Sequence, residues 1–262
     1  MLKYMVFFCT LFIGCFSIVL SADAHMSSRQ EYEKSGQAIW ETATKKKVVA
    51  ITFDDGPSPT YTPQILDVLA KHRAKATFFV TGKNANKYPD VLKRTVKEGH
   101  EVGNHTYTHI YDRSKSVKKL KREIDLTAQT VKKITGQETT LYRPVGGMYN
   151  DSIMNTAADK NHLVVMWSWH QDPKDWLRLP ANKISNHVIK HLRSGDIILL
   201  HDAGGNRTQT IRALDKILDY LDKSGYQCVT VSDLIYQSKV LDHDTLPGDP
   251  SDDYFSHSLK NS

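Results

Sequence analysis

The chain alternates short apolar runs with longer segments in which apolar residues recur at helical spacing. From Val48 to Phe53 only Thr52 is polar and the run is rich in β-branched residues, which predicts a buried strand. Leu120 and Ile124 begin an apolar stripe that predicts the longest helix. The predicted strands are 48–53, 76–80, 101–104, 141–143, 163–169, 196–200 and 228–231. The predicted helices are 62–71, 89–98, 117–135, 151–160, 183–192 and 208–224.

This alternation predicts the fold class. Strands that are apolar throughout are typical of a parallel sheet that helices cover on the outside. The run of strand–helix units fits a closed or nearly closed barrel of about seven strands better than two separate sheets. We therefore expect an α/β protein built as a (β/α) barrel, with a doubly wound sheet as the structural alternative.

The two ends of the chain differ from this regular region. An uncharged, mostly apolar run follows Lys3, and Ala22-Asp23-Ala24 has the small-x-small pattern of a signal peptidase site. We expect a signal peptide at 1–24 and a secreted or cell-wall-associated mature chain, with an uncleaved membrane anchor as the alternative. We expect residues 25–46 to form a linker or a wrapping segment and residues 47–237 to form the folded domain. Residues 238–262 are expected to form a polar, disordered tail.

Composition and cysteine content exclude several classes of function. Hydrophobic residues make up 40% of the chain and charged residues 24%, which is typical of a globular protein. The net charge of +6 is spread out, so we expect no nucleic-acid partner, and no obligatory protein partner is evident. Cys9 and Cys15 lie in the expected signal peptide, and Cys228 alone remains, which excludes an internal disulfide and a thiol-rich metal site.

Polar clusters follow five of the predicted strands. The carboxyl ends of parallel strands share one face of an α/β barrel, and that face carries catalysis, so the clusters should converge there. A surface turn explains any one of them, but it would have to explain all five at once. The clusters are Asp54-Asp55-Gly56-Pro57, His105-Thr106-Tyr107-Thr108-His109, Arg143-Pro144-Val145-Gly146-Gly147, Asp172-Pro173-Lys174-Asp175-Trp176 and His201-Asp202.

Two of these clusters suggest a metal site. His105 and His109 are four residues apart, a spacing that places both imidazoles on one face of helical or turn backbone. Two histidines with one carboxylate form a usual catalytic zinc set that leaves a position for water. The adjacent carboxylates of Asp54 and Asp55 can divide the work, one as a ligand and the other as the acceptor of a proton from water.

The remaining clusters offer groups for acid–base chemistry. Arg143 can hold a carboxylate by a bidentate contact and keep it ionised. The pair Gly146-Gly147 can present backbone N–H groups to a developing oxyanion. His201 is a candidate general acid if a carboxylate raises its pKa, and Asp175 is the expected partner, with Asp172 as the fallback.

Taken in order, the motifs resemble the polysaccharide deacetylase family, also called carbohydrate esterase family 4 or the NodB homology domain. The resemblance covers about residues 47–236. It implies a distorted (β/α) barrel and a divalent metal, usually zinc and sometimes cobalt or another ion. The motifs that carry it are Thr52-Phe53-Asp54-Asp55-Gly56-Pro57, His105-Thr106-Tyr107-Thr108-His109, Arg143-Pro144, Asp175-Trp176 and Leu199-Leu200-His201-Asp202.

The resemblance also implies a role for each residue of the metal centre. By the family pattern, Asp54 is the general base and Arg143 orients it. The metal ligands are Asp55, His105 and His109.

The family pattern assigns the other side of the site as well. His201 is the general acid, tuned by Asp175. The oxyanion is shared by the metal and the backbone N–H of Gly146, while Trp176 and Leu199 line the pocket for the acetyl methyl group.

The expected function is that of a secreted, metal-dependent N-deacetylase of N-acetylglucosamine polymers. Peptidoglycan is the preferred substrate because a basic chain suits an anionic wall, and chitin or chitooligosaccharides are the alternative. Val145 and Gly146 stand where many family members have Pro and Tyr, which can reshape a subsite. Two other hypotheses stay open: a non-catalytic glycan-binding scaffold, and an amidohydrolase for a small non-sugar amide, which a narrow, closed pocket would favour.

Overall fold

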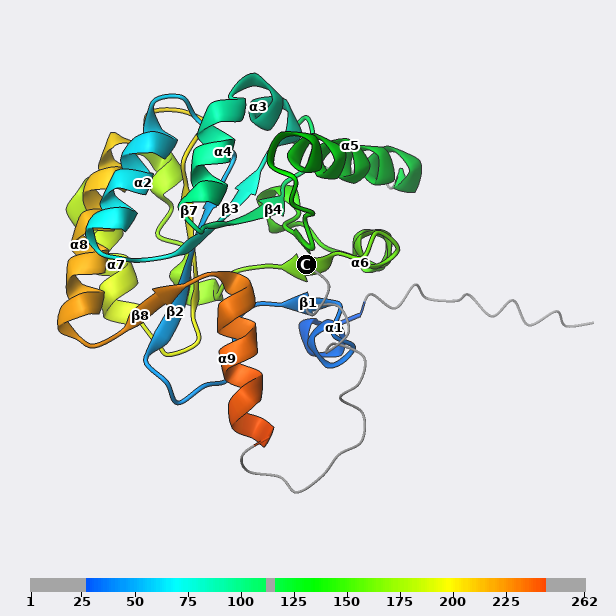
Figure 1. Cartoon of the computed structure of the whole chain (residues 1–262). Coiled ribbons are helices and arrows are strands. Elements are labelled where there is room, and N and C mark those ends of the chain that lie inside the picture. Colours follow the sequence, from blue (N-terminus) through cyan, green and yellow to red (C-terminus); the bar gives the residue numbers. More distant parts are fainter. Residues whose placement is uncertain (1–26, 112–115, 244–262) are drawn as a thin grey trace, which may run out of the picture.

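Eight parallel strands form one curled sheet in the computed structural model, which describes residues 27–111 and 116–243 (Figure 1). The described strands are β1 (Ala38–Ile39), β2 (Val48–Asp54), β3 (Ala76–Val80), β4 (Glu101–Asn104), β5 (Leu141–Tyr142), β6 (Leu163–Val165), β7 (Ile197–His201) and β8 (Gln227–Val229). The described helices are α1 (Arg29–Lys34), α2 (Tyr61–Lys71), α3 (Gly82–Lys87), α4 (Pro89–Lys97), α5 (Val117–Thr135), α6 (Asp151–Ala158), α7 (Ala181–His191), α8 (Thr208–Lys223) and α9 (Val231–His243). No helix among these residues has the length and apolar character needed to cross a membrane.

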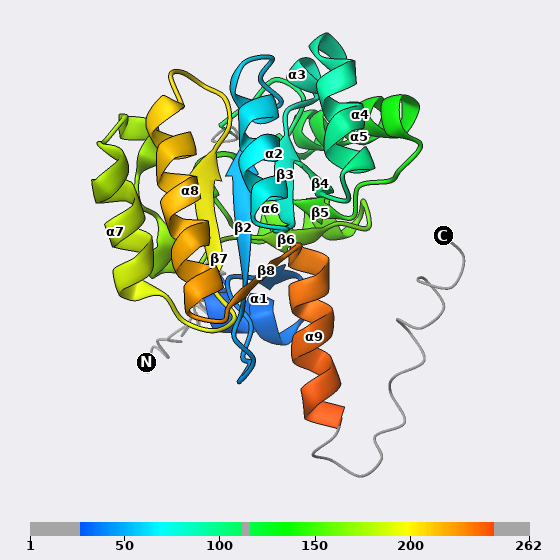
Figure 2. The same ribbon diagram turned by 60° about the vertical axis from the view of Figure 1, so that its left-hand side comes forward.

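The strand order confirms the predicted barrel. The sheet runs β1-β6-β5-β4-β3-β2-β7, with β8 beside the first residues of β2, and every ladder is parallel. Strands β2 to β6 lie side by side in chain order, and helices on the outside join each to the next, as Figures 1 and 2 show. Within the described residues β1 and β7 share no ladder, and only an isolated antiparallel bridge joins Glu41, after β1, to Asp196, before β7, so strand pairing does not close the barrel. The sheet contains one strand more than the prediction, namely β1.

Alternation along β2 explains why this strand carries part of the site. Val49, Ile51 and Phe53 are fully buried and pack toward the helices, in one hydrophobic cluster with residues of α2, α7 and α8. Fully burying such a side chain contributes about 1.5–3 kcal/mol. Because successive side chains of a strand point to opposite faces, Thr52 and Asp54 point into the barrel. The last residue of the strand is therefore a carboxylate at the mouth of the barrel.

The segment predicted as a linker is instead part of the fold. Helix α1 begins with a capping box in which Ser28 and Glu31 satisfy each other's backbone N–H groups. Strand β1 then pairs with β6, and Trp40, directly after it, is fully buried against Tyr149, at 5.3 Å between ring centroids. The buried Trp40 ties this region to the sheet.

Other boundaries also differ from the prediction. Strand β6 ends at Val165 rather than at residue 169, and a short 3-10 helix, Trp169–Gln171, follows. Helix α9 continues into the predicted tail as far as His243. The short helix α3 was not predicted, because its six residues show no apolar stripe. The expected signal peptide and residues 244–262 of the expected tail lie outside the described residues.

Candidate active site

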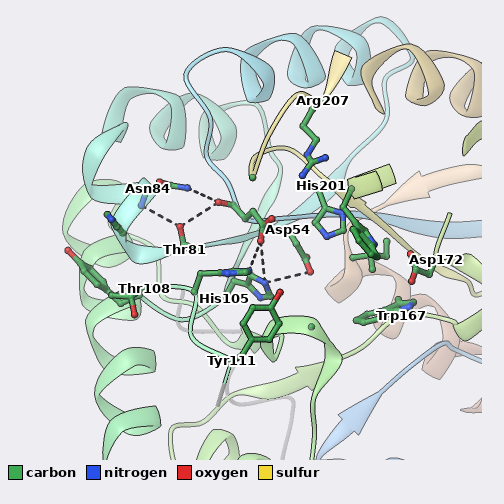
Figure 3. Close-up of a pocket in the computed structure, with 18 residues that line it drawn as sticks. Asp54, Thr81, Asn84, His105, Thr108, Tyr111, Trp167, Asp172, His201 and Arg207 are labelled. Atoms are coloured by element: carbon green, nitrogen blue, oxygen red, sulfur yellow. Dashed lines mark hydrogen bonds and ion pairs between the residues drawn. The ribbon is translucent and has the colours of Figure 1, made fainter. Parts of the chain in front are cut away.

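A pocket of about 640 Å³ lies at the carboxyl ends of the strands, and it unites the predicted clusters (Figure 3). The predicted residues that line it are Asp54, Asp55, His105, His109, Gly146, Trp176, Leu199 and His201. Arg143 and Asp175 lie directly behind it, in contact with Asp54 and His201. The five polar clusters therefore converge on one face, as the parallel topology predicts.

Asp54 is held at the end of β2 by a buried arginine. Nη1 of Arg143 donates to Oδ1 of Asp54 at 2.8 Å, while Oδ2 of Asp54 lies on the pocket side, 3.8 Å from Nε2 of His105. The expected bidentate contact is wrong, because Arg143 uses its other donors elsewhere. Nε and Nη2 bind the carbonyl oxygens of Val165 and Met166 at 2.9 and 2.8 Å. These two contacts hold the chain where β6 ends.

Asp55, His105 and His109 form a set of potential metal ligands. One ligand atom from each lies within 4.8 Å of the other two. Oδ1 of Asp55 is 2.9 Å from Nε2 of His109 and 3.7 Å from Nε2 of His105. Two imidazole nitrogens and one carboxylate oxygen suit a catalytic zinc-type site. The residues present thus fit the metal that the sequence motifs imply.

The protonation state of His105 suits a ligand. Its Nδ1 donates to the carbonyl oxygen of Arg143 at 2.7 Å, so Nε2 keeps a lone pair directed at Asp55. Burial lowers the pKa of His105 and favours the neutral ring. Burial also opposes ionisation of Asp55, but the hydrogen bond from His109 and the nearby histidines outweigh it and lower the pKa of Asp55 to about 2. The hydrogen bond to Asp55 raises the pKa of His109.

The backbone at Asp55 is held in an uncommon conformation. Its φ is 80°, in the left-handed region that non-glycine residues seldom adopt. Its carbonyl oxygen accepts a hydrogen bond from Nδ2 of Asn84 at 2.8 Å, and the hydroxyl of Thr81 lies 3.5 Å away. Thr81 also caps α3 by accepting from the N–H of Asn84 (Figure 3). The unpredicted helix α3 thus fixes a predicted metal ligand.

His201 has the carboxylate partner that the general-acid hypothesis requires. Its Nδ1 lies 2.7 Å from Oδ1 of Asp175, and Oδ2 of Asp175 accepts the backbone N–H of His201 and the hydroxyl of Thr210. Burial opposes the charged ring, but Asp175 outweighs burial and raises the pKa of His201 to about 9. Asp172, the fallback partner, also lines the pocket but accepts the N–H of Lys174.

The apolar wall of the pocket contains the residues predicted for it. Leu199 is almost fully buried and Trp176 is 46% exposed. Gly146 has φ 64°, and a Cβ there would lie 2.8 Å from the ring of Tyr111. Within the described residues its N–H makes no hydrogen bond, whereas the N–H of Gly147 donates to Pro144. Gly146 lines the pocket, and its N–H is not used by another acceptor among these residues.

Several lining residues were not predicted as part of the site. Tyr111 packs edge-on against His109, at 5.5 Å between ring centroids, and is 58% exposed at the rim. Arg207, which directly precedes α8, also lines the pocket. Tyr111 follows the motif two residues after His109, so its proximity was a usable signal, whereas Arg207 stands in a glycine-rich stretch with no pattern to mark it.

The sequence is similar to those of known polysaccharide deacetylases. The chain matches the family described as polysaccharide deacetylase over residues 41–165. A peptidoglycan-N-acetylglucosamine deacetylase of Bacillus cereus is 48% identical over 210 residues, covering 80% of this chain and 98% of that protein. A chitooligosaccharide deacetylase of Sinorhizobium fredii is 37% identical, covering 68% of this chain and 87% of that protein.

A solved structure is similar to this chain in both fold and sequence. The Bc1960 peptidoglycan N-acetylglucosamine deacetylase, in complex with 4-naphthalen-1-yl-N-oxidanyl-benzamide, has a TM-score of 0.75 at 33% identity, covering 78% of this chain and 95% of that chain. The chain belongs to the polysaccharide deacetylase family. The predicted enzyme class, a deacetylating hydrolase, is confirmed.

Proposed function

We propose that this chain is an exported, zinc-dependent N-deacetylase that removes acetyl groups from the N-acetylglucosamine residues of peptidoglycan. One observation carries the proposal: Asp55, His105 and His109 meet in a pocket that also holds Asp54 on one side and His201 on another. The name of the 48% identical Bacillus cereus relative supports peptidoglycan as the substrate. Export rests on the apolar run and Ala-x-Ala pattern of residues 1–24.

Asp54 is the general base for the attack of water on the acetamide carbonyl. A divalent cation held by Asp55, His105 and His109 would polarise the acetamide carbonyl and lower the pKa of water. Oδ1 of Asp54 is occupied by Arg143, so Oδ2 is the oxygen free to take the proton of the attacking water. As the new C–O bond forms, the carbonyl oxygen gains negative charge.

Residues on the other side of the pocket assist the departure of the amine. The N–H of Gly146 would donate to the developing oxyanion. His201, kept protonated by Asp175, would donate its Nε2 proton to the amide nitrogen as the C–N bond breaks. Trp176 and Leu199 would contact the acetyl methyl group. The products are acetate and a free amine on the sugar.

The shape of the pocket bears on the competing hypotheses. Its volume, about 640 Å³, is far larger than an acetamide group needs. Half-exposed aromatic rings at the rim, Tyr111 and Trp176, suit the apolar faces of a sugar. These features favour a glycan over a small non-sugar amide. The full set of acid, base and ligand side chains in one pocket argues against a non-catalytic scaffold.

The decisive experiment measures acetate release. Metal-free protein is reloaded with zinc and incubated separately with peptidoglycan and with chitooligosaccharides, and free acetate is quantified. We expect release from peptidoglycan, and greater release from chitooligosaccharides would instead assign the alternative substrate. Asp54→Asn is the control: it should keep zinc and lose about 10²–10⁴-fold in kcat. No acetate from either substrate would refute the proposal.

A further inference from the structure

The turn that carries both candidate histidine ligands is conformationally strained. Thr106 and His109 have φ values of 66° and 58°, in the left-handed region. Each such non-glycine residue costs about 1–3 kcal/mol and persists only where its surroundings hold it. The groups that hold this turn therefore decide whether the two imidazoles face the same point.

His105 is held at both its backbone and its ring. Its N–H donates to the carbonyl oxygen of Val80 at 2.9 Å, and its Nδ1 is fixed by the carbonyl of Arg143.

The ring of His109 is held less firmly: within the part of the chain that the structure describes, it hydrogen-bonds only to Asp55, and it packs edge-on against Tyr111, which is itself 58% exposed. Its side chain is also 35% exposed. The position of His109 thus depends on the backbone on both sides of it; after it, the N–H of Ile110 donates to the Thr106 hydroxyl at 3.3 Å.

A buried carboxylate on α5 holds the backbone before His109. Oε2 of Glu123 accepts the N–H of Thr108 at 2.7 Å, and both carboxylate oxygens lie 3.1 Å from the Thr108 hydroxyl. Glu123 is only 8% exposed, because it lies on the buried face of α5 beside Leu120 and Ile124. Thr108 immediately precedes His109. Glu123 itself does not line the pocket, and it is not one of the three residues whose ligand atoms cluster.

The opposite side of the turn is held by α3. The N–H groups of Gly82 and Lys83 donate to the carbonyl oxygens of Thr106 and Tyr107 at 3.0 and 2.9 Å. A Cβ on Gly82 would lie 2.2 Å from the ring of Tyr107, so the helix approaches the turn as closely as its backbone permits. The contacts from α3 end at Tyr107. The next residue, Thr108, is held by the hydrogen bond from its N–H to Glu123, directly before His109.

We propose that Glu123 is a positioning residue for the metal site: by binding Thr108 it pre-organises His109 and so raises metal affinity. The inference rests on the proposed function, because it takes His109 to be a ligand. Groups that orient metal ligands typically contribute 10–100-fold in affinity. The effect acts through hydrogen bonds rather than charge, so glutamine, which still offers an oxygen to the Thr108 N–H, should replace Glu123 well and alanine should not.

The test measures zinc affinity of the metal-free full chain by competition with a chromogenic chelator. Glu123→Ala should weaken zinc binding about 10–100-fold, and Glu123→Gln should restore most of the loss. Glu101→Ala is the matched control, because Glu101 likewise accepts a hydroxyl, from Thr77 at 2.8 Å, and a backbone N–H, from Ser232 at 3.2 Å, but outside the pocket. It should lower the melting temperature and leave zinc affinity unchanged.

The outcomes separate this inference from the proposed function. Wild-type protein that binds no zinc would overturn both. Wild-type protein that binds zinc, with a folded Glu123→Ala variant of equal affinity, would overturn only the role of Glu123, and so would equal losses from alanine and glutamine. Should Glu123→Ala fail to fold, Thr108→Val removes only the hydroxyl contact and should weaken zinc binding by a smaller factor, which Thr108→Ser should restore. An unchanged affinity in Thr108→Val would then refute the inference.

Discussion

His105 and His201 lie in the same pocket and are bound in the same way, yet their surroundings give them opposite protonation states. Each ring is largely buried and each is fixed through Nδ1, at 2.7 Å in both cases. The acceptor differs: a backbone carbonyl for His105 and the carboxylate of Asp175 for His201. Burial therefore wins at His105 and lowers its pKa, whereas the carboxylate wins at His201 and raises its pKa to about 9.

The charge of one hydrogen-bond acceptor is thus enough to divide two chemically identical side chains into different roles. A neutral imidazole offers a lone pair and suits metal ligation. An imidazolium carries a proton and suits protonation of a leaving amine. The two rings come from the ends of β4 and β7, so the barrel supplies both environments at one mouth.

The largest expected effect separates these roles directly. His105→Ala should abolish stable zinc binding, because a ligand is lost, with a loss beyond the ~10–100-fold that outer contacts contribute. His201→Ala should bind zinc as wild type does and lose about 10²–10⁴-fold in kcat. Zinc titration and single-turnover acetate release on both variants check the pair. Similar zinc loss in both variants would show that the two rings do not differ in role.

A second prediction concerns the pH dependence that Asp175 sets. His201 must be protonated to act as an acid, so activity should fall as pH rises through its pKa. Asp175→Asn removes the negative charge that stabilises protonated His201 against the effect of burial. The pKa of His201 should therefore fall, and the basic limb of the kcat–pH profile should move to lower pH by about 1–3 units. A bound divalent cation also lowers this pKa, so the difference between variant and wild type is the quantity to compare.

The pH–rate profiles of both proteins, recorded at saturating zinc, give that difference. Thr210→Val serves as a control, because it removes a neutral contact to Asp175 and keeps the carboxylate. It should move the basic limb far less than Asp175→Asn. A basic limb that stays in place in Asp175→Asn would mean that His201 does not limit the reaction at high pH.

The smallest expected effect concerns the apolar wall. Trp176→Ala should lower kcat/KM roughly 10-fold, the order of effect that apolar pocket contacts have on specificity. Trp169→Ala is a matched control, since Trp169 is also about half exposed, at 50%, but does not line the pocket. On a short oligosaccharide it should have little effect. Equal values of kcat/KM for the two variants in steady-state kinetics would show that Trp176 does not contribute to the acetyl site.

The sequence predicted the residues of the site better than the contacts between them. Strand exits could be located because apolar runs end abruptly at polar clusters, and parallel topology then requires those clusters to converge. The same logic placed Asp54 and His201 at strand ends, and the structure adds that their Cα positions are partners in the β2–β7 ladder. The choice of Asp175 over Asp172 agrees with the geometry.

What escaped prediction depends on contacts between elements that are distant in the sequence. Glu123 reads as one more charge on a basic helix, because periodicity describes a helix face and not its partner. Thr81 and Asn84 belong to a helix too short to show an apolar stripe. Trp40 is a single large apolar residue in a polar segment, and only pairing of β1 with β6 shows why it is buried.

Arg143 joins two functions of the pocket in one residue. Its backbone carbonyl orients the ring of His105, and its guanidinium holds Asp54. The candidate ligand His105 and the candidate proton acceptor Asp54 are therefore both fixed to the same residue. Displacement of Arg143 would therefore act on both groups at once.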